Sequence, residues 1–221
     1  MKRFSGDISI VLGGAAGQGI QTVEAMLVSV LKAEGYRIFA CKEYMSRIRG
    51  GSNSTEIRIG KGMPLAYVDH IDFLLALDKD VIPHLTHRIG KHTIILGEKE
   101  KVQWDGAHII DLPFTKLSAE LGNPIFASTI AVGAVLGMLG AERKPFEDYL
   151  RAHFARKGEE IVKKNLEAAA KGMDFGSHVA FMEGFEVSLR KDETVREELL
   201  LDGNTALGLG AIAAGCDFAS S

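Results

Sequence analysis

Apolar side chains recur along the chain in two periods, and these periods predict strands and helices that follow one another. Residues 8–12 are almost entirely apolar and run into glycines, as the first parallel strand of an α/β domain does. In residues 18–34, apolar side chains lie three and four positions apart, which predicts an amphipathic helix that Gly35 is suited to end. Residues 36–40 are rich in β-branched and aromatic side chains and predict a second strand.

Strand and helix patterns continue to alternate through the rest of the chain. The apolar run 71–77 suits a strand buried on both faces, whereas the alternating pattern of 54–59 predicts a half-exposed strand. Asn123 and Pro124 begin the next long helix, as N-cap and first residue. Further elements are expected as short helical pieces within 79–89, strands at 92–96 and 108–111, and helices at 125–140, 145–154 and 159–172. This order predicts an α/β fold, a three-layer Rossmann-like domain with a mainly parallel central sheet and helices on both faces.

The expected helix 125–140 is unusual because small residues recur along it. They are Ala127, Ala131, Gly133 and Ala134. Because small residues let a neighbouring backbone come close, we expect this helix to be deeply buried against another helix or strand.

Composition agrees with a globular domain. The chain has 221 residues, 46% hydrophobic and 25% charged, with a net charge of −3, so no basic nucleic-acid-binding surface stands out. No apolar run approaches the roughly 18 residues of a membrane-spanning helix, and Asp7 and Gly13 interrupt the apolar stretch that a signal peptide would need. Two distant cysteines, Cys41 and Cys216, argue against a disulfide framework and against an all-cysteine iron–sulfur site. We therefore expect a cytoplasmic, reduced protein.

The turn Gly14–Gly19 after the first strand is the first candidate site. A dinucleotide fingerprint requires G-x-G-x-x-G, but Ala16 occupies the middle glycine position, and no G-K-[ST] of a P-loop follows. Glu43 does lie at roughly the distance of the fingerprint's acidic residue. Two interpretations stay open: a tight strand–helix turn without a ligand, and a helix N-terminus that binds an anion or cofactor through its free N–H groups.

The segment Arg47-Ile48-Arg49-Gly50-Gly51 is the second candidate. Two guanidinium groups beside flexible glycines can bind a phosphate or a carboxylate in bidentate fashion. Alternatively, they pair with Glu43, with Glu56 or with acidic groups of a partner chain.

Other reactive side chains give weaker signals. His84 and His87 lie three residues apart but lack a third metal ligand. Cys41 is better explained as a structural residue than as a reactive thiol. The residues alone therefore show no complete catalytic set.

Three segments taken together resemble the gamma domain of 2-oxoacid:ferredoxin oxidoreductases of the pyruvate, 2-oxoglutarate and ketoisovalerate type. They are GGAAGQGIQTVEAML (13–27), EYMSRIRGGSNSTEIRI (43–59) and IDFLLALD (71–78), and the resemblance extends over roughly residues 6–185. One departure is Ala15-Ala16, where the family often has glycine. The form EYMSRIRGG most resembles enzymes in which gamma is fused ahead of the alpha, pyrimidine-binding domain.

The C-terminal segment carries a second resemblance. Residues 203–215 are similar to the GN-x-A…GA-x-x-AG opening of that alpha domain. This implies three parts: a gamma-type domain at 1–187, a charged, exposed linker at 188–202, and a truncated opening of the alpha domain at 203–221. We expect the chain to be a fragment of a fused gamma–alpha subunit and residues 204–221 to be poorly anchored.

The resemblance also implies a reaction and partners. The family oxidatively decarboxylates a 2-oxoacid to acyl-CoA and passes electrons to ferredoxin. The gamma portion would have a structural and assembly role and be inactive alone. It would bind no cofactor itself, because thiamine diphosphate, Mg²⁺ and [4Fe-4S] clusters are expected on partner subunits. Those partners are the remainder of alpha and the beta subunit, with coenzyme A and ferredoxin reached through the complex. A homodimer of the isolated chain is a further expectation, and no nucleic-acid or membrane partner is expected.

The candidate ligand-contact or interface residues are Gly14, Gly17, Gln18, Gly19, Arg47, Arg49, Gly50, Gly51 and Asn53. No catalytic residue and no metal ligand is assigned. The alternative function is a free-standing nucleotide- or acyl-CoA-binding α/β module that uses the Gly14–Gly19 turn with Arg47 and Arg49.

Overall fold

The computed structural model describes residues 2–44, 51–105 and 109–218. Its strands are β1 Lys2–Ser5, β2 Ile8–Ala15, β3 Arg37–Glu43, β4 Ser52–Gly60, β5 Phe73–Ala76, β6 Ile94–Gly97, β7 Ile109–Asp111 and β8 Phe185–Ser188. Its α-helices are α1 Ile20–Ala33, α2 Val81–Leu85, α3 Lys99–Val102, α4 Phe114–Glu120, α5 Ala127–Met138, α6 Arg143–Phe154, α7 Glu159–Met182 and α8 Gly203–Ala213. Short 3-10 helices span Thr86–Arg88, Pro124–Phe126, Ala155–Lys157 and Glu193–Arg196.

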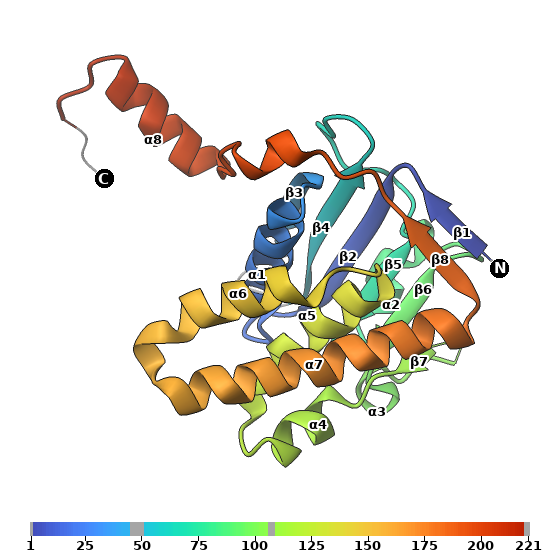
Figure 1. The fold of residues 1–221 in the computed structure, drawn as a ribbon. Helices are drawn as coiled ribbons and strands as arrows, with labels where there is room; N and C mark the ends of the chain where they lie inside the picture. The colour runs from blue at the N-terminus through green and yellow to red at the C-terminus, as the bar shows by residue number, and fades with distance from the viewer. Residues whose placement is uncertain (1, 45–50, 106–108, 219–221) are drawn as a thin grey trace.

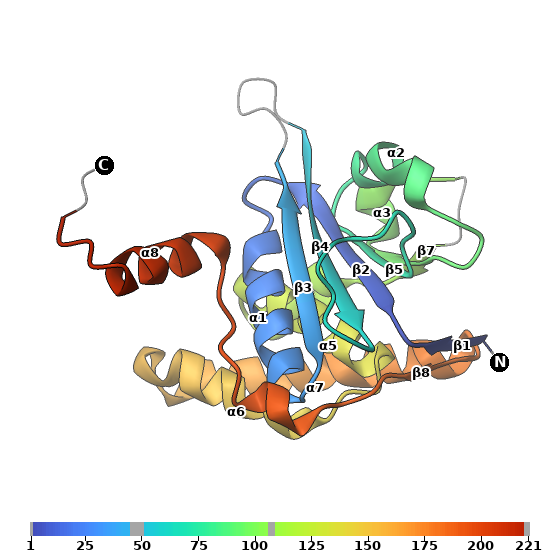
Figure 2. The same cartoon turned by 90° about the horizontal axis from the view of Figure 1, so that it is seen from above.

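A six-stranded sheet lies at the centre of the molecule, in the order β3-β4-β2-β5-β6-β7 (Figures 1 and 2). Strands β2, β5, β6 and β7 pair in parallel, and β4 is antiparallel to both of its neighbours, β2 and β3. The predicted mainly parallel sheet is confirmed. The antiparallel insertion of β4 between β2 and β3 is an addition that the strand patterns alone did not predict.

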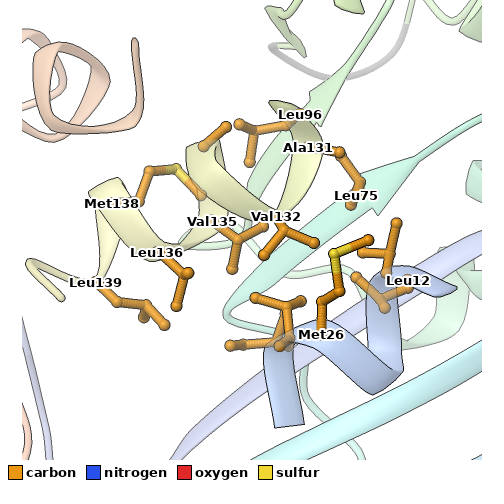
Figure 3. Packing of buried hydrophobic residues seen from close by; sticks show 14 of the residues in the cluster. Leu12, Met26, Leu75, Leu96, Ala131, Val132, Val135, Leu136, Met138 and Leu139 are labelled. Atoms are coloured by element: carbon orange, nitrogen blue, oxygen red, sulfur yellow. The ribbon is translucent and has the colours of Figure 1, made fainter. Parts of the chain in front are cut away.

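Helices cover the two faces of this sheet unequally. The larger core gathers side chains of α1, α4, α5, α6 and α7 on one face, and the smaller core gathers those of α2 and α3 on the other. The alternation along β2 makes the division visible, since Leu12 faces the larger core and Val11 the smaller one. Figure 3 shows how Met26 of α1, Val132 of α5 and Leu12 of the sheet meet in the larger core.

Helix α5 runs through the middle of the helical layer and crosses α7 at glycines. A Cβ added at Gly176 would lie 2.0 Å from the carbonyl oxygen of Ala134, and one at Gly137 would lie 2.2 Å from that of Met173. Such distances leave no room for a side chain, so glycine is required on both helices. The expected burial of this segment against another helix is confirmed, because every residue of α5 from Thr129 to Met138 is buried.

The N-terminus and the end of the helical layer are joined by a small second sheet. Strand β1 pairs in parallel with β8, and Phe4 and Phe185 stack edge to face with ring centroids 5.7 Å apart. Neither strand was predicted. Helix α7 is also longer than expected, since it continues past residue 172 to Met182.

The segment 188–202, predicted to be an exposed, charged linker, is mostly exposed, but residues 191–198 also contact the domain. Val195 is only 4% exposed, and the charged residues around it pair with α1 and β3. Helix α8, by contrast, extends away from the domain, and all of its residues are exposed (Figures 1 and 2). Of the helices in the described ranges, none is both long enough and apolar enough to cross a membrane.

Candidate functional site

An open hollow of about 810 Å³ lies beside the Gly14–Gly19 turn, and we call it the glycine-turn cleft. The β2–α1 turn and the adjacent ends of β3 and β4 lie at the same edge of the sheet (Figure 2), and residues of each line the hollow. Its lining consists of Ala15, Ala16, Gly17, Gly19, Ile20, Gln21, Thr22, Glu43, Tyr44, Gly51, Asn53, Ser54 and Thr55. Gly51, the described residue of the Arg47–Gly51 segment, therefore lies at the same site as the Gly14–Gly19 turn.

The predicted site residues are distributed unevenly around this cleft. Gly17, Gly19, Gly51 and Asn53 line it. Gly14 and Gln18 lie in the turn beside it but do not line it. Arg47, Arg49 and Gly50 lie outside the described residues.

The turn itself is held by Gln18. The Gln18 backbone N–H donates to the carbonyl of Ala15 at 3.2 Å, and the Gln18 side-chain oxygen accepts from the N–H of Ala15 at 2.8 Å. Gly17 and Gly19 have φ of 90° and 82°, a region that side chains disfavour. Glycine and glutamine at these positions are therefore explained by the turn's own geometry.

Helix α1 begins directly at the cleft. Its N-cap is Gly19, which offers no side-chain hydrogen bond, and its first turn carries no acidic residue. The N–H groups at the start of a helix carry partial positive charge. The cleft is thus compatible with an anionic group, whether from a ligand or from a partner chain.

The usual ligand crevice of an open α/β sheet lies between two strands whose following helices cover opposite faces. Here that position is between β2, which leads to α1, and β5, which leads to α2. A Cβ at Gly13 would lie 2.4 Å from Cγ1 of Val81, and one at Gly14 would lie 3.0 Å from Cβ of Leu77. Apolar side chains fill the crevice, and the open space is displaced toward the antiparallel strands.

One wall of the cleft is polar and centres on Glu43. Its carboxylate accepts a hydrogen bond from the Ser54 hydroxyl at 2.9 Å and lies 3.2 Å from Nε2 of His84. Burial raises the pKa of Glu43, but the Ser54 hydrogen bond and His84 outweigh this and hold the pKa below its ordinary 4.5. His84, considered as a metal ligand from the sequence, instead contacts a carboxylate. In the part of the chain that the structure describes, no group of three His, Cys, Asp or Glu residues could hold a metal ion.

Glu56, another suggested partner for the arginines, is buried and already engaged. It forms an ion pair with Arg88, accepts from the N–H of Val68 at 3.1 Å and from the Ser9 hydroxyl at 3.3 Å. Sequence reasoning missed Arg88, because nothing in its neighbourhood indicates a partner 32 residues away. Burial raises the pKa of the nearby Cys41 thiol, which favours the structural interpretation of that cysteine.

The described lining of the cleft includes Glu43 and Tyr44 as titratable side chains and places the Ser54 hydroxyl 2.9 Å from the Glu43 carboxylate. A carboxylate whose pKa lies below 4.5 is a weak base for activating a hydroxyl near neutral pH. Through these side chains and its backbone N–H groups, the cleft can contact a ligand or a partner chain.

Solved structures define the class of protein to which this fold belongs. A 2-oxoglutarate:ferredoxin oxidoreductase from Magnetococcus marinus matches 95% of this chain and 37% of its own, with a TM-score of 0.83 and 21% identity. The gamma subunit of a keto/oxoacid ferredoxin oxidoreductase from Geobacter sulfurreducens matches 78% of this chain and 98% of its own, with a TM-score of 0.66 and 21% identity. The fold is therefore that of a Rossmann-like domain of such oxidoreductases.

Sequence comparison identifies the family. The 2-oxoglutarate synthase subunit KorC of Archaeoglobus fulgidus is 26% identical over 175 residues, which are 78% of this chain and 90% of that subunit. An alpha subunit of a 2-oxoacid:ferredoxin oxidoreductase from Aeropyrum pernix is 24% identical over 76% of this chain, but the match spans only 34% of that subunit. The family model described as pyruvate ferredoxin/flavodoxin oxidoreductase matches residues 9–175, and the chain belongs to this family. The resemblance found in the sequence is confirmed.

Proposed function

We propose that this chain is the gamma portion of a 2-oxoacid:ferredoxin oxidoreductase and that its role is structural and assembly-related. The observation that carries the proposal is the family match over residues 9–175. The cleft supports it, because the Glu43 carboxylate beside the Ser54 hydroxyl has a lowered pKa and is a weak base. The near-complete coverage of a separate gamma-type relative supports the gamma assignment.

The glycine-turn cleft is the part of the chain that we assign to contact with the rest of the complex. Gly17, Gly19, Gly51 and Asn53 would form its floor, and Gly14 and Gln18 would keep the turn in shape. We assign Arg47, Arg49 and Gly50, which follow β3 in the sequence, to the same contact. The contacted group is a partner subunit or an anionic ligand such as coenzyme A held by the complex.

Cofactor chemistry would belong to partner subunits, in the cytoplasm. Two cysteines cannot supply the four thiolates that an iron–sulfur cluster normally takes. Thiamine diphosphate, when bound to such a complex, supplies the carbanion chemistry of 2-oxoacid decarboxylation. We assign residues 203–221 to the opening of the alpha domain, with residues 188–202 as the connection to it.

The alternative, a free-standing nucleotide-binding module, is not favoured. Leu77 and Val81 fill the crevice in which open α/β sheets bind nucleotides, and the middle glycine of the dinucleotide fingerprint is Ala16.

The test is reconstitution. Ferredoxin reduction is measured with coenzyme A and with pyruvate, 2-oxoglutarate or ketoisovalerate, for the chain alone, for the remaining subunits alone, and for both together. We expect turnover only in the combined sample. Turnover of any of these 2-oxoacids by the purified chain would contradict the proposal.

A pair of variants then separates the two roles of the cleft. Asn53→Ala lies in the cleft, and Lys163→Ala, on the exposed side of α7, is its control. If the cleft contacts coenzyme A, Asn53→Ala raises the KM for coenzyme A while the complex still assembles. If it contacts a subunit, the same variant weakens assembly, measured by sedimentation, whereas Lys163→Ala changes neither quantity.

A further inference from the structure

Residues 191–198 are fastened to the domain, and the first contact joins a partly exposed lysine to a buried carboxylate. Lys191 Nζ lies 2.8 Å from Glu34 Oε2 and 2.8 Å from Glu142 Oε1, and the Glu34 side chain is fully buried. Burial lowers the pKa of Lys191, but the hydrogen bond to Glu142 and the ion pair with Glu34 outweigh this and raise the pKa above its ordinary 10.5. Because a buried carboxylate is costly without a partner, the end of α1 depends on Lys191 staying in place.

The second contact is made to the start of β3. One guanidinium nitrogen of Arg37 lies 3.0 Å from Asp192 and 3.0 Å from Glu198, so it holds both ends of the segment. The Lys32 ammonium donates to the carbonyl of Arg196 at 2.5 Å. Val195 lies between these charges and is 4% exposed.

The third contact is between backbones. The Asp192 N–H donates to the carbonyl of Gly35 at 2.8 Å. A Cβ added at Gly35 would lie 2.8 Å from the Asp192 carbonyl oxygen, and Gly35 has φ of +89°. Residue 35 must therefore be glycine for the segment to pack here, because a side chain would meet the Asp192 backbone.

These contacts end where the chain leaves the domain. Leu199 is 81% exposed, Leu200 and Leu201 are also exposed, and α8 follows with every residue in solvent (Figures 1 and 2). A charged linker without such contacts would let the following helix swing freely.

We propose that residues 191–198 form a clasp that fixes the direction in which the chain leaves the α/β domain toward α8. The proposal rests on the contacts with Glu34, Gly35 and Arg37 and does not depend on the proposed function.

The test measures the exit direction in the full chain. Spin labels are placed at Leu201→Cys, just after the clasp, and at His178→Cys, an exposed position of α7, in a Cys41→Ser/Cys216→Ser background. Pulsed electron–electron double resonance then gives the width of the distribution of distances between the two labels. Amide exchange of Asp192 reports the clasp itself, and amide exchange of Leu74 in β5 reports the fold.

Two pairs of variants isolate the clasp. Gly35→Ala pushes a methyl group against Asp192. Its control is Gly140→Ala just after α5, where φ is also positive, at +69°, but where nothing lies within 4 Å of an added methyl group. Arg37→Gln removes the two ion pairs, and its control is Arg143→Gln, which removes the ion pair with Asp174 between α6 and α7.

We expect a narrow distance distribution in the starting protein and in both controls. In Gly35→Ala and Arg37→Gln the distribution broadens and the Asp192 amide exchanges at least about tenfold faster, while Leu74 stays protected. A broad distribution in the starting protein, or a narrow one in both clasp variants, would overturn the proposal.

Discussion

Glu43 joins two elements by means of one carboxylate. It accepts from Ser54 on β4 and contacts His84 on α2, so it fastens the end of the β3–β4 hairpin at the cleft wall. The hydrogen bond from Ser54 favours the charged form of Glu43, and so does protonated His84. The charge of Glu43, and with it the strength of its contacts with Ser54 and His84, therefore depends on pH.

The direction of that dependence follows from the lowered pKa. A carboxyl group whose pKa is lower in the folded state stabilises the fold above its ordinary pKa of 4.5, and this contribution is lost as the pH falls through the folded value. We expect an NMR titration to give Glu43 a pKa below 4.5 and Ser54→Ala to raise it. A matched change at Thr194, whose hydroxyl donates to Asp192 away from the cleft, should leave the Glu43 titration unchanged. A Glu43 pKa at or above 4.5 would contradict the assignment.

At the residue scale, the glycines of the turn have a local cause and the contacts of Glu43 do not. The need for glycine at positions 17 and 19 comes from the turn's own backbone, and the sequence shows that turn directly. The partners of Glu43 could not be predicted in this way, because Ser54 lies 11 and His84 lies 41 residues further along the chain. Only the folded sheet brings them together.

At the scale of elements, the α5–α7 crossing sets how the helical layer packs. Gly133 and Gly137 of α5 meet Gly172 and Gly176 of α7 backbone to backbone. A hydrogen bond of 2.8 Å between the Thr129 hydroxyl and Asn165 Oδ1 fixes the register of the two helices. A change in the register of α5 against α7 would therefore also change how the helical layer packs on the sheet.

We predict that Gly176→Ala lowers the free energy of unfolding by about 2 kcal/mol or more, because the added methyl group meets a backbone carbonyl that cannot yield. Gly208→Ala is the matched control, since its site in α8 has nothing within 4 Å. Urea unfolding followed by circular dichroism measures both. Equal stabilities of the two variants would show that the helices can separate at no cost.

Most elements were predictable because their apolar side chains recur with a clear helical or strand period. The first strand, the first helix and the apolar strand around residues 73–76 appear where the pattern placed them. Pro83 limits the region after β5 to short helices, as expected. Strands β1 and β8 were missed, since each is four residues long and their pairing joins opposite ends of the domain.

At the scale of the molecule, the exposed apolar surface is concentrated at the C-terminal end. Leu199 is 81% exposed, and Leu207, Ile212 and Phe218 are 76%, 71% and 82% exposed. Scattered apolar side chains are normal on a surface, but a helix that carries several of them into solvent favours association. The sequence indicated a weakly anchored tail, and the structure agrees in showing α8 without a buried residue.

We predict that the isolated chain associates as its concentration rises and that removal of residues 199–221 prevents this. The shortened chain should keep the thermal unfolding midpoint of the full chain, because the domain's buried cores lie entirely before residue 199. Sedimentation velocity at several concentrations measures the association. A full-length chain that stays monomeric throughout, or a shortened chain that still associates, would contradict the prediction.

The pairing of β1 with β8 has a consequence for synthesis on the ribosome. Residues 185–188 are synthesised roughly 180 residues after their partners, residues 2–5. At about 5–20 residues per second, β1 waits on the order of ten seconds or longer before it can pair. During that interval Phe4 has neither Phe185 nor the strand beside it to pack against. A ribosome-associated chaperone that binds exposed apolar segments would therefore have β1 available as a binding site during this interval.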